Sequence, residues 1–134
     1  MDKLALYLWI GLGSALGGMG RYWLSSIAAQ RFGDTFPWGT LIVNVSGSFA
    51  IGLFAAFVGP DGRWAVSTRT GLFLMSGLCG GYTTFSAFSL QTLDLLRHGQ
   101  WRQAGANAVV SVILCLGAVW LGYWAGRALN RSPG

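Results

Sequence analysis

The chain has 134 residues, of which 53% are hydrophobic and only 10% are charged. Soluble domains carry roughly a quarter charged residues, so this composition excludes an ordinary soluble fold and indicates a membrane protein. The net charge of +5 comes from basic side chains scattered singly between apolar segments. Nucleic-acid binding requires basic side chains clustered on one face, so no nucleic-acid partner is expected.

Four apolar segments are each long enough to cross a bilayer, which takes about 20 residues. They cover approximately residues 4–29, 38–58, 70–95 and 103–129. The connections between them, such as the one with Pro60-Asp61-Gly62, have the composition of turns. We therefore expect an all-α membrane protein, with residues 1–134 forming a single four-helix transmembrane domain.

The first segment is rich in glycine and carries one arginine near its end. Gly13 and Gly17 have the small-xxx-small spacing that lets a second helix approach closely. Arg21 has two interpretations. Its side chain can extend to the lipid headgroups, or it can line an aqueous vestibule and attract anions.

The second segment carries a polar stripe on an otherwise apolar helix, because Thr40, Asn44, Gly47 and Ser48 recur at helical spacing. An intramembrane asparagine either bridges two helices or faces a pore. Because hydroxyl side chains lie beside it, we expect Asn44 to face a pore.

The third segment has the most unusual sequence, running from Gly77 to Ser89. Three glycines within five residues weaken a helix, and broken helices at membrane depth commonly bind ions through unwound carbonyls. The segment therefore predicts a helix broken at mid-membrane that contains an ion site. Phe85 and Phe88 are three residues apart and share a face. The edge of an aromatic ring is electropositive, so these rings can contact a small anion.

The fourth segment contains Asn107 and Ser111, a polar pair at i, i+4. This pair either bonds to a neighbouring helix or extends a hydrogen-bonding track along a pore.

Basic residues are balanced between the two ends of the predicted bundle. One end has Lys3, Arg63, Arg69, Arg127 and Arg131, and the other has Arg31, Arg97 and Arg102, with Arg21 if it extends there. Orientation in the membrane follows an excess of Lys and Arg on one side. This balance permits a homodimer of oppositely oriented copies.

Other classes of function fit the sequence less well. A proton-coupled exporter needs a titratable group at membrane depth, yet the chain has no Glu. Asp94 lies near the end of the third segment, and His98 lies in the loop that follows it. A scaffold that only oligomerises through glycine motifs would leave Asn44 without a role. An enzyme is not expected, because carboxylate pairs and Cys/His clusters are missing from the sequence.

Three motifs resemble the CrcB/Fluc fluoride channel family: Gly17-Gly-Met-Gly-Arg-Tyr22, Gly39-Thr-Leu-Ile-Val-Asn-Val-Ser-Gly-Ser-Phe49 and Gly77-Leu-Cys-Gly-Gly-Tyr-Thr-Thr-Phe-Ser-Ala-Phe-Ser89. They occur in order over essentially the whole chain. The resemblance implies a fluoride-selective channel in the bacterial inner membrane that exports fluoride passively and lowers its toxicity. It also implies a dual-topology homodimer with two pores.

The same resemblance suggests roles for individual residues. It implies a central structural sodium ion bound by the backbone carbonyls of Gly80 and Thr83 from both subunits. The residues expected to contact fluoride are Asn44, Phe85 and Phe88, with a hydroxyl face formed by Thr84, Ser86 and Ser111. Where family members often have threonine between the two phenylalanines, this chain has Ala87.

Overall fold

The computed structural model describes residues 2–59 and 66–131, and within these ranges the chain is helical apart from short connections. The first two segments form α1 (Lys3–Phe32) and α2 (Trp38–Val58). The third is divided into α3 (Thr68–Gly71), η1 (Leu72–Cys79), α4 (Gly80–Tyr82) and α5 (Phe85–Arg97), and the fourth is α6 (Trp101–Asn130). The expected all-α architecture is therefore confirmed. The turn expected at Pro60-Asp61-Gly62, and Arg63, lie outside the described residues.

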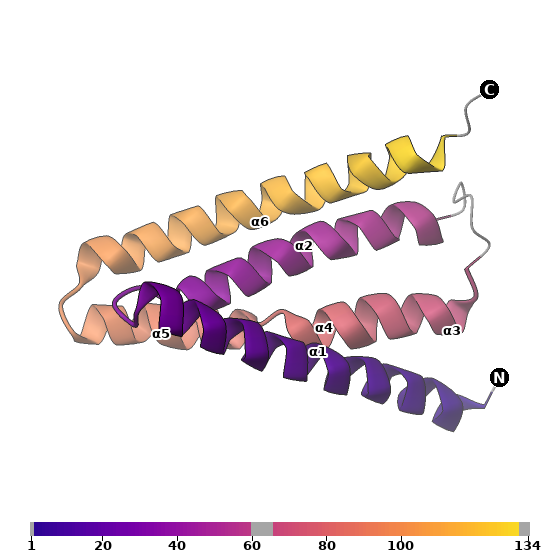
Figure 1. Ribbon diagram of the computed structural model, residues 1–134, viewed down its shortest axis with the longest axis horizontal. Helices are drawn as coiled ribbons and strands as arrows, with labels where there is room; N and C mark the ends of the chain where they lie inside the picture. Colours follow the sequence, from indigo (N-terminus) through magenta and orange to yellow (C-terminus); the bar gives the residue numbers. More distant parts are fainter. Residues whose placement is uncertain (1, 60–65, 132–134) are drawn as a thin grey trace.

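The helices form two packed pairs (Figure 1). Helix α2 runs alongside α6, and α1 crosses the continuous rod of α3, η1 and α4. Helix α5 packs against the first half of α6. The start of α1 and the end of α6 lie at the same end of the bundle, which agrees with the four segments predicted from the sequence.

Among the described helices, α2 and α6 are long and apolar enough to cross a membrane by length and composition. Helix α1 is as long as α6, with 30 residues, but its glycines, serines and Arg21 dilute the apolar side chains. The third segment is interrupted, so none of its pieces reaches the required length.

Local sequence explains where several helices begin and end. Asp2 caps α1 by accepting a hydrogen bond from the Leu4 N–H at 3.1 Å. The helix ends at Gly33, whose φ of 79° is in the left-handed region that favours glycine. Helix α5 is capped by Thr84, whose hydroxyl accepts from the Ala87 N–H at 3.1 Å.

Glycines allow the two long contacts of the bundle. A Cβ at Gly13 would lie 2.6 Å from the Phe73 carbonyl oxygen and 2.9 Å from the Gly77 Cα. A Cβ at Gly52 would lie 3.0 Å from the Tyr123 nitrogen. Real Cβ contacts are longer than this, so backbone packs directly on backbone in both pairs.

The break in the third segment lies two residues beyond the glycines. The expectation that the glycines themselves unwind the helix is wrong, because Gly77, Gly80 and Gly81 lie within the helical stretch that ends at Tyr82. Thr83 and Thr84 have extended backbone, with ψ angles of 157° and 108°. The physical reason is that Gly77 and Gly81 pack tightly against α1, which stabilises the helix despite their low propensity. Within the rod, η1 has the wider π-helical form, which is common near functional sites.

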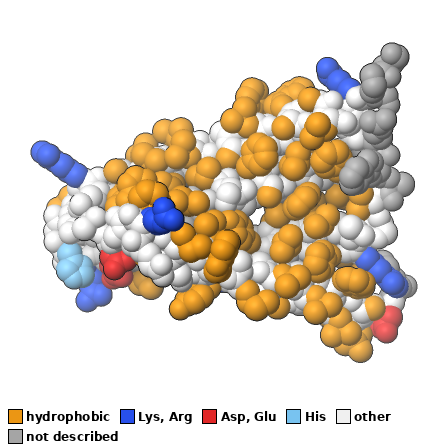
Figure 2. All heavy atoms as spheres, in the orientation of Figure 1, with side chains coloured by type: hydrophobic (Ala, Val, Ile, Leu, Met, Phe, Trp, Pro, Cys, Tyr) orange, Lys and Arg blue, Asp and Glu red, His pale blue; other side chains and the backbone are white. Residues whose placement is uncertain are grey.

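The outer surface is mainly apolar. Figure 2 shows hydrophobic side chains over much of the visible face, with the acidic side chains and the histidine near its two ends. The largest exposed side chains include Tyr7, Trp23 and Leu116, with exposed fractions of 68%, 67% and 65%. Exposed apolar area of this extent suits contact with lipid or with another chain.

Candidate functional site

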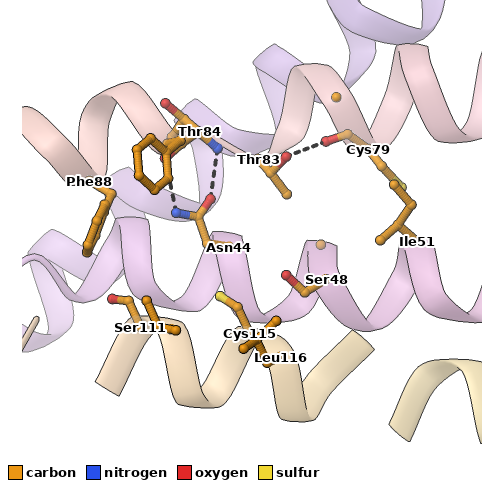
Figure 3. Close-up of a pocket in the computed structure, with 14 residues that line it drawn as sticks. Asn44, Ser48, Ile51, Cys79, Thr83, Thr84, Phe88, Ser111, Cys115 and Leu116 are labelled. Carbon is orange, nitrogen blue, oxygen red and sulfur yellow. Dashed lines mark hydrogen bonds between the residues drawn. The ribbon is translucent and has the colours of Figure 1, made fainter. Parts of the chain in front are cut away.

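A cavity of about 370 Å³ lies beside the break, between α2, α6 and the α4–α5 junction (Figure 3). It brings together seven of the residues predicted to form the site: Asn44, Gly80, Thr83, Thr84, Phe85, Phe88 and Ser111. Its remaining walls are Gly47, Ser48, Ile51, Cys79, Val112, Cys115 and Leu116. None of these lining residues is acidic or basic, so the cavity is polar only through neutral groups.

Asn44 binds the backbone of the break through both ends of its carboxamide. Its Nδ2 donates to the Thr84 carbonyl at 3.0 Å, and its Oδ1 accepts from the Thr84 N–H at 2.8 Å. Both bonds are visible in Figure 3. The side chain therefore bridges α2 to the third segment and lines the cavity at the same time, so the two interpretations of Asn44 are compatible.

Phe85 and Phe88 follow the break on the first turn of α5. Their ring centroids are 5.3 Å apart, with 46° between the ring planes. Phe88 is half-buried, whereas Phe85 is 77% exposed in the single chain. A large aromatic side chain this exposed is available to a second chain or to the cavity beside it.

The hydroxyl groups form two sets around the cavity. Thr84 Oγ1 and Ser86 Oγ are hydrogen bonded at 3.2 Å. Ser86 is exposed and lies beside the cavity rather than in its wall. Ser111 lines the cavity from α6 and is buried.

A chain of hydrogen bonds leads away from Ser111 toward one end of the bundle. Ser111 Oγ donates to Asn107 Oδ1 at 3.2 Å, and Asn107 Nδ2 donates to Thr92 Oγ1 at 2.9 Å. Thr92 Oγ1 donates to the Phe88 carbonyl at 2.7 Å. The predicted Asn107/Ser111 pair thus both bonds to α5 and extends a polar track. Thr92 was not predicted from the sequence to be part of this track. Its position one helical turn after Phe88 could have indicated that it lies on the same face of α5.

The backbone at the break leaves carbonyl oxygens free of the helical ladder. Thr83 donates both its N–H and its hydroxyl to the Cys79 carbonyl, at 2.9 and 2.8 Å. The Thr84 N–H donates to Asn44 Oδ1. The Gly80 carbonyl therefore lacks the N–H donor that residue 84 would supply in a continuous helix. The Thr83 carbonyl precedes the N-cap of α5 and lies outside its ladder. Two hard oxygen donors therefore lie at the break.

Arg21 lies apart from this cavity, half-buried on α1. A second cavity of about 420 Å³ lies where α1 ends and α2 begins, and Asp34, Asp94 and His98 line it. The Oε1 atom of Gln91, in the same wall, is buried without a hydrogen-bond partner among the described residues. Asp34, Asp94 and His98 thus line this second cavity and not the one beside the break.

Within residues 2–59 and 66–131, no three His, Cys, Asp or Glu side chains are grouped to bind a metal ion.

Comparison with known proteins gives matches over nearly the whole chain. A family model described as CrcB-like protein, Camphor Resistance (CrcB), matches residues 8–123. A relative from Opitutus terrae named fluoride-specific ion channel FluC is 56% identical over 131 residues, covering 98% of this chain and 99% of the relative. Proteins of the same name from Methylocella silvestris and Paramagnetospirillum magneticum are 53% and 55% identical, covering 96% and 93% of this chain and 98% of each relative.

Proposed function

The chain belongs to the CrcB/FluC family of fluoride-specific ion channels, and we propose that the cavity beside the break is part of its conducting path. The protein is accordingly a fluoride channel of the membrane and not an enzyme. The observation that carries the proposal is that one cavity collects the Asn44 amide, the Ser111 hydroxyl and the Phe88 ring without a charged side chain.

The chemistry of this cavity suits a small, strongly hydrated anion. A selective pore must replace the water around fluoride with hydrogen-bond donors. Asn44 uses one Nδ2 hydrogen on Thr84, which leaves its second hydrogen for an anion. The hydroxyls of Thr84, Ser86 and Ser111 and the electropositive edges of Phe85 and Phe88 add further donors. Because all of them are neutral, the ion is bound weakly enough to leave.

Fluoride export through such a pore then needs no energy source other than the membrane potential. A membrane potential of 100 mV, negative inside, is worth about 2.3 kcal/mol per charge. At equilibrium this potential alone keeps cytoplasmic fluoride about fiftyfold below the external concentration. A passive pore in the bacterial inner membrane would therefore lower the toxicity of fluoride. Arg21, on α1, would attract fluoride at the entrance.

The break is proposed to bind one structural sodium ion. The carbonyls of Gly80 and Thr83 are the hard oxygen ligands that a hard cation prefers, and unwound helices bind sodium in this way. Gly80 is exposed in the single chain. A second copy, oppositely oriented as the balanced charges permit, would supply matching carbonyls and complete the site. The exposure of Phe85 supports such a homodimer.

The experiment that tests passive transport is fluoride efflux from liposomes that also contain a pH indicator, with valinomycin setting the potential. A channel carries fluoride whenever potassium balances the charge, and the luminal pH stays constant. The alternative is a proton-coupled exporter, in which each fluoride would move with a fixed number of protons. A stoichiometric pH change that persists at every potential would contradict the channel.

A further inference from the structure

The Asn44 carboxamide pairs with Thr84 as the backbone of an opposed residue on a neighbouring strand would. In a continuous helix the Thr84 N–H would donate to the Gly80 carbonyl, four residues earlier. In this structure it donates to Asn44 Oδ1 at 2.8 Å, while the Thr84 carbonyl accepts from Asn44 Nδ2 at 3.0 Å. Two residues that lie opposite each other in antiparallel strands exchange both N–H···O bonds in the same way. Thr84 has the matching extended backbone, with a φ of −153° and a ψ of 108°.

We infer that Asn44 is a positioning residue that holds the third segment open at Thr84. The carboxamide satisfies both backbone groups of Thr84, and an unsatisfied N–H at membrane depth is costly. By holding Thr84 extended, it fixes the direction in which α5 leaves the break. The positions of Phe85 and Phe88, and the free carbonyl of Gly80, follow from this one pairing.

The neighbouring residues on α2 allow Asn44 to reach the backbone. A Cβ at Gly47 would lie 3.0 Å from Tyr82 Cδ1 and would also overlap the Thr83 side chain. The glycine therefore lets α2 approach the break closely. The hydroxyl of Thr84 caps α5 on its own, so it defines where α5 starts but leaves the Thr84 N–H to Asn44.

This inference concerns the backbone and does not depend on which ion passes. The test uses the full chain in lipid nanodiscs with isotope-labelled threonine. The carbon shifts and the amide exchange of Thr83 and Thr84 are measured by NMR for Asn44→Ala, Asn44→Asp and Asn130→Ala. Asn130 is a matched control, because its Nδ2 also donates to a backbone carbonyl, that of Ala56 at 3.1 Å, far from the break.

For Asn44→Ala we expect one of two results at Thr84: carbon shifts that move to helical values, or amide exchange about tenfold faster, the factor that one net hydrogen bond is worth. Asn44→Asp keeps an oxygen acceptor for the N–H and should restore slow exchange, and Asn130→Ala should match the wild type. Wild-type shifts and exchange in Asn44→Ala would overturn the inference. If that variant also lost fluoride efflux, Asn44 would act directly on the ion, and the proposed function would stand.

Discussion

Replacing Gly17 with alanine should disrupt the contact between α1 and the end of α4. A Cβ at Gly17 would lie against the Leu78 carbonyl and 2.7 Å from the Tyr82 nitrogen, whereas ordinary contacts begin at 3.4 Å. The two backbones must therefore separate by at least about 0.7 Å, the difference between 3.4 and 2.7 Å, and by more at the Leu78 carbonyl. A gap of this size forfeits a quarter to a half of each dispersion contact, and overpacking of this kind costs about 1–3 kcal/mol.

Gly18→Ala is the matched control, because a Cβ at Gly18 has no neighbour within 4 Å. Both variants gain the same helix propensity, about 1 kcal/mol over glycine, so their difference isolates the clash. The free energy of unfolding, measured by circular dichroism in mixed detergent micelles, should be about 1–3 kcal/mol lower for Gly17→Ala than for Gly18→Ala. Fluoride efflux should also fall in Gly17→Ala, because Tyr82 directly precedes the break. Equal stability and efflux in the two variants would refute the close packing.

Three further changes test other parts of the structure. Phe85→Ile removes an electropositive ring edge and should lower fluoride efflux at least about tenfold; unchanged efflux would favour a scaffold. Gly52→Ala should separate α2 from α6 and lower the free energy of unfolding by about 1–3 kcal/mol. Gly117→Ala should not lower it, because a Cβ at Gly117 has no neighbour within 4 Å. Equal stability of the two variants would contradict the close contact at Gly52. Arg21→Gln should slow efflux in low salt and much less near 1 M salt, where charges are screened within about 3 Å. A deficit independent of salt would exclude an electrostatic role.

Much of the fold could be predicted from local patterns in the sequence. Apolar length predicts the four segments, and i, i+4 spacing predicts the bond between Asn107 and Ser111. The exact position of the break could not be predicted this way. Glycine propensity points to Gly77–Gly81, but packing against α1 keeps these residues helical. Tertiary contact thus overrides the local preference.

The site was predictable in composition and only partly in geometry. Spacing along α2 places Asn44, Gly47 and Ser48 on one face, and all three line the cavity. The bonds of Asn44 to Thr84 join residues 40 apart in the sequence, so no local pattern reveals them. The same holds for the bond between Thr92 and Asn107, which depends on how α5 packs against α6.

The most direct measurement of the central claim compares fluoride with chloride efflux through the reconstituted wild-type protein, using an ion-selective electrode for each anion. A cavity of neutral donors that replaces the hydration shell of a small anion predicts rapid fluoride efflux and chloride efflux no faster than from protein-free liposomes. Equal release of the two anions, or of neither, would contradict it.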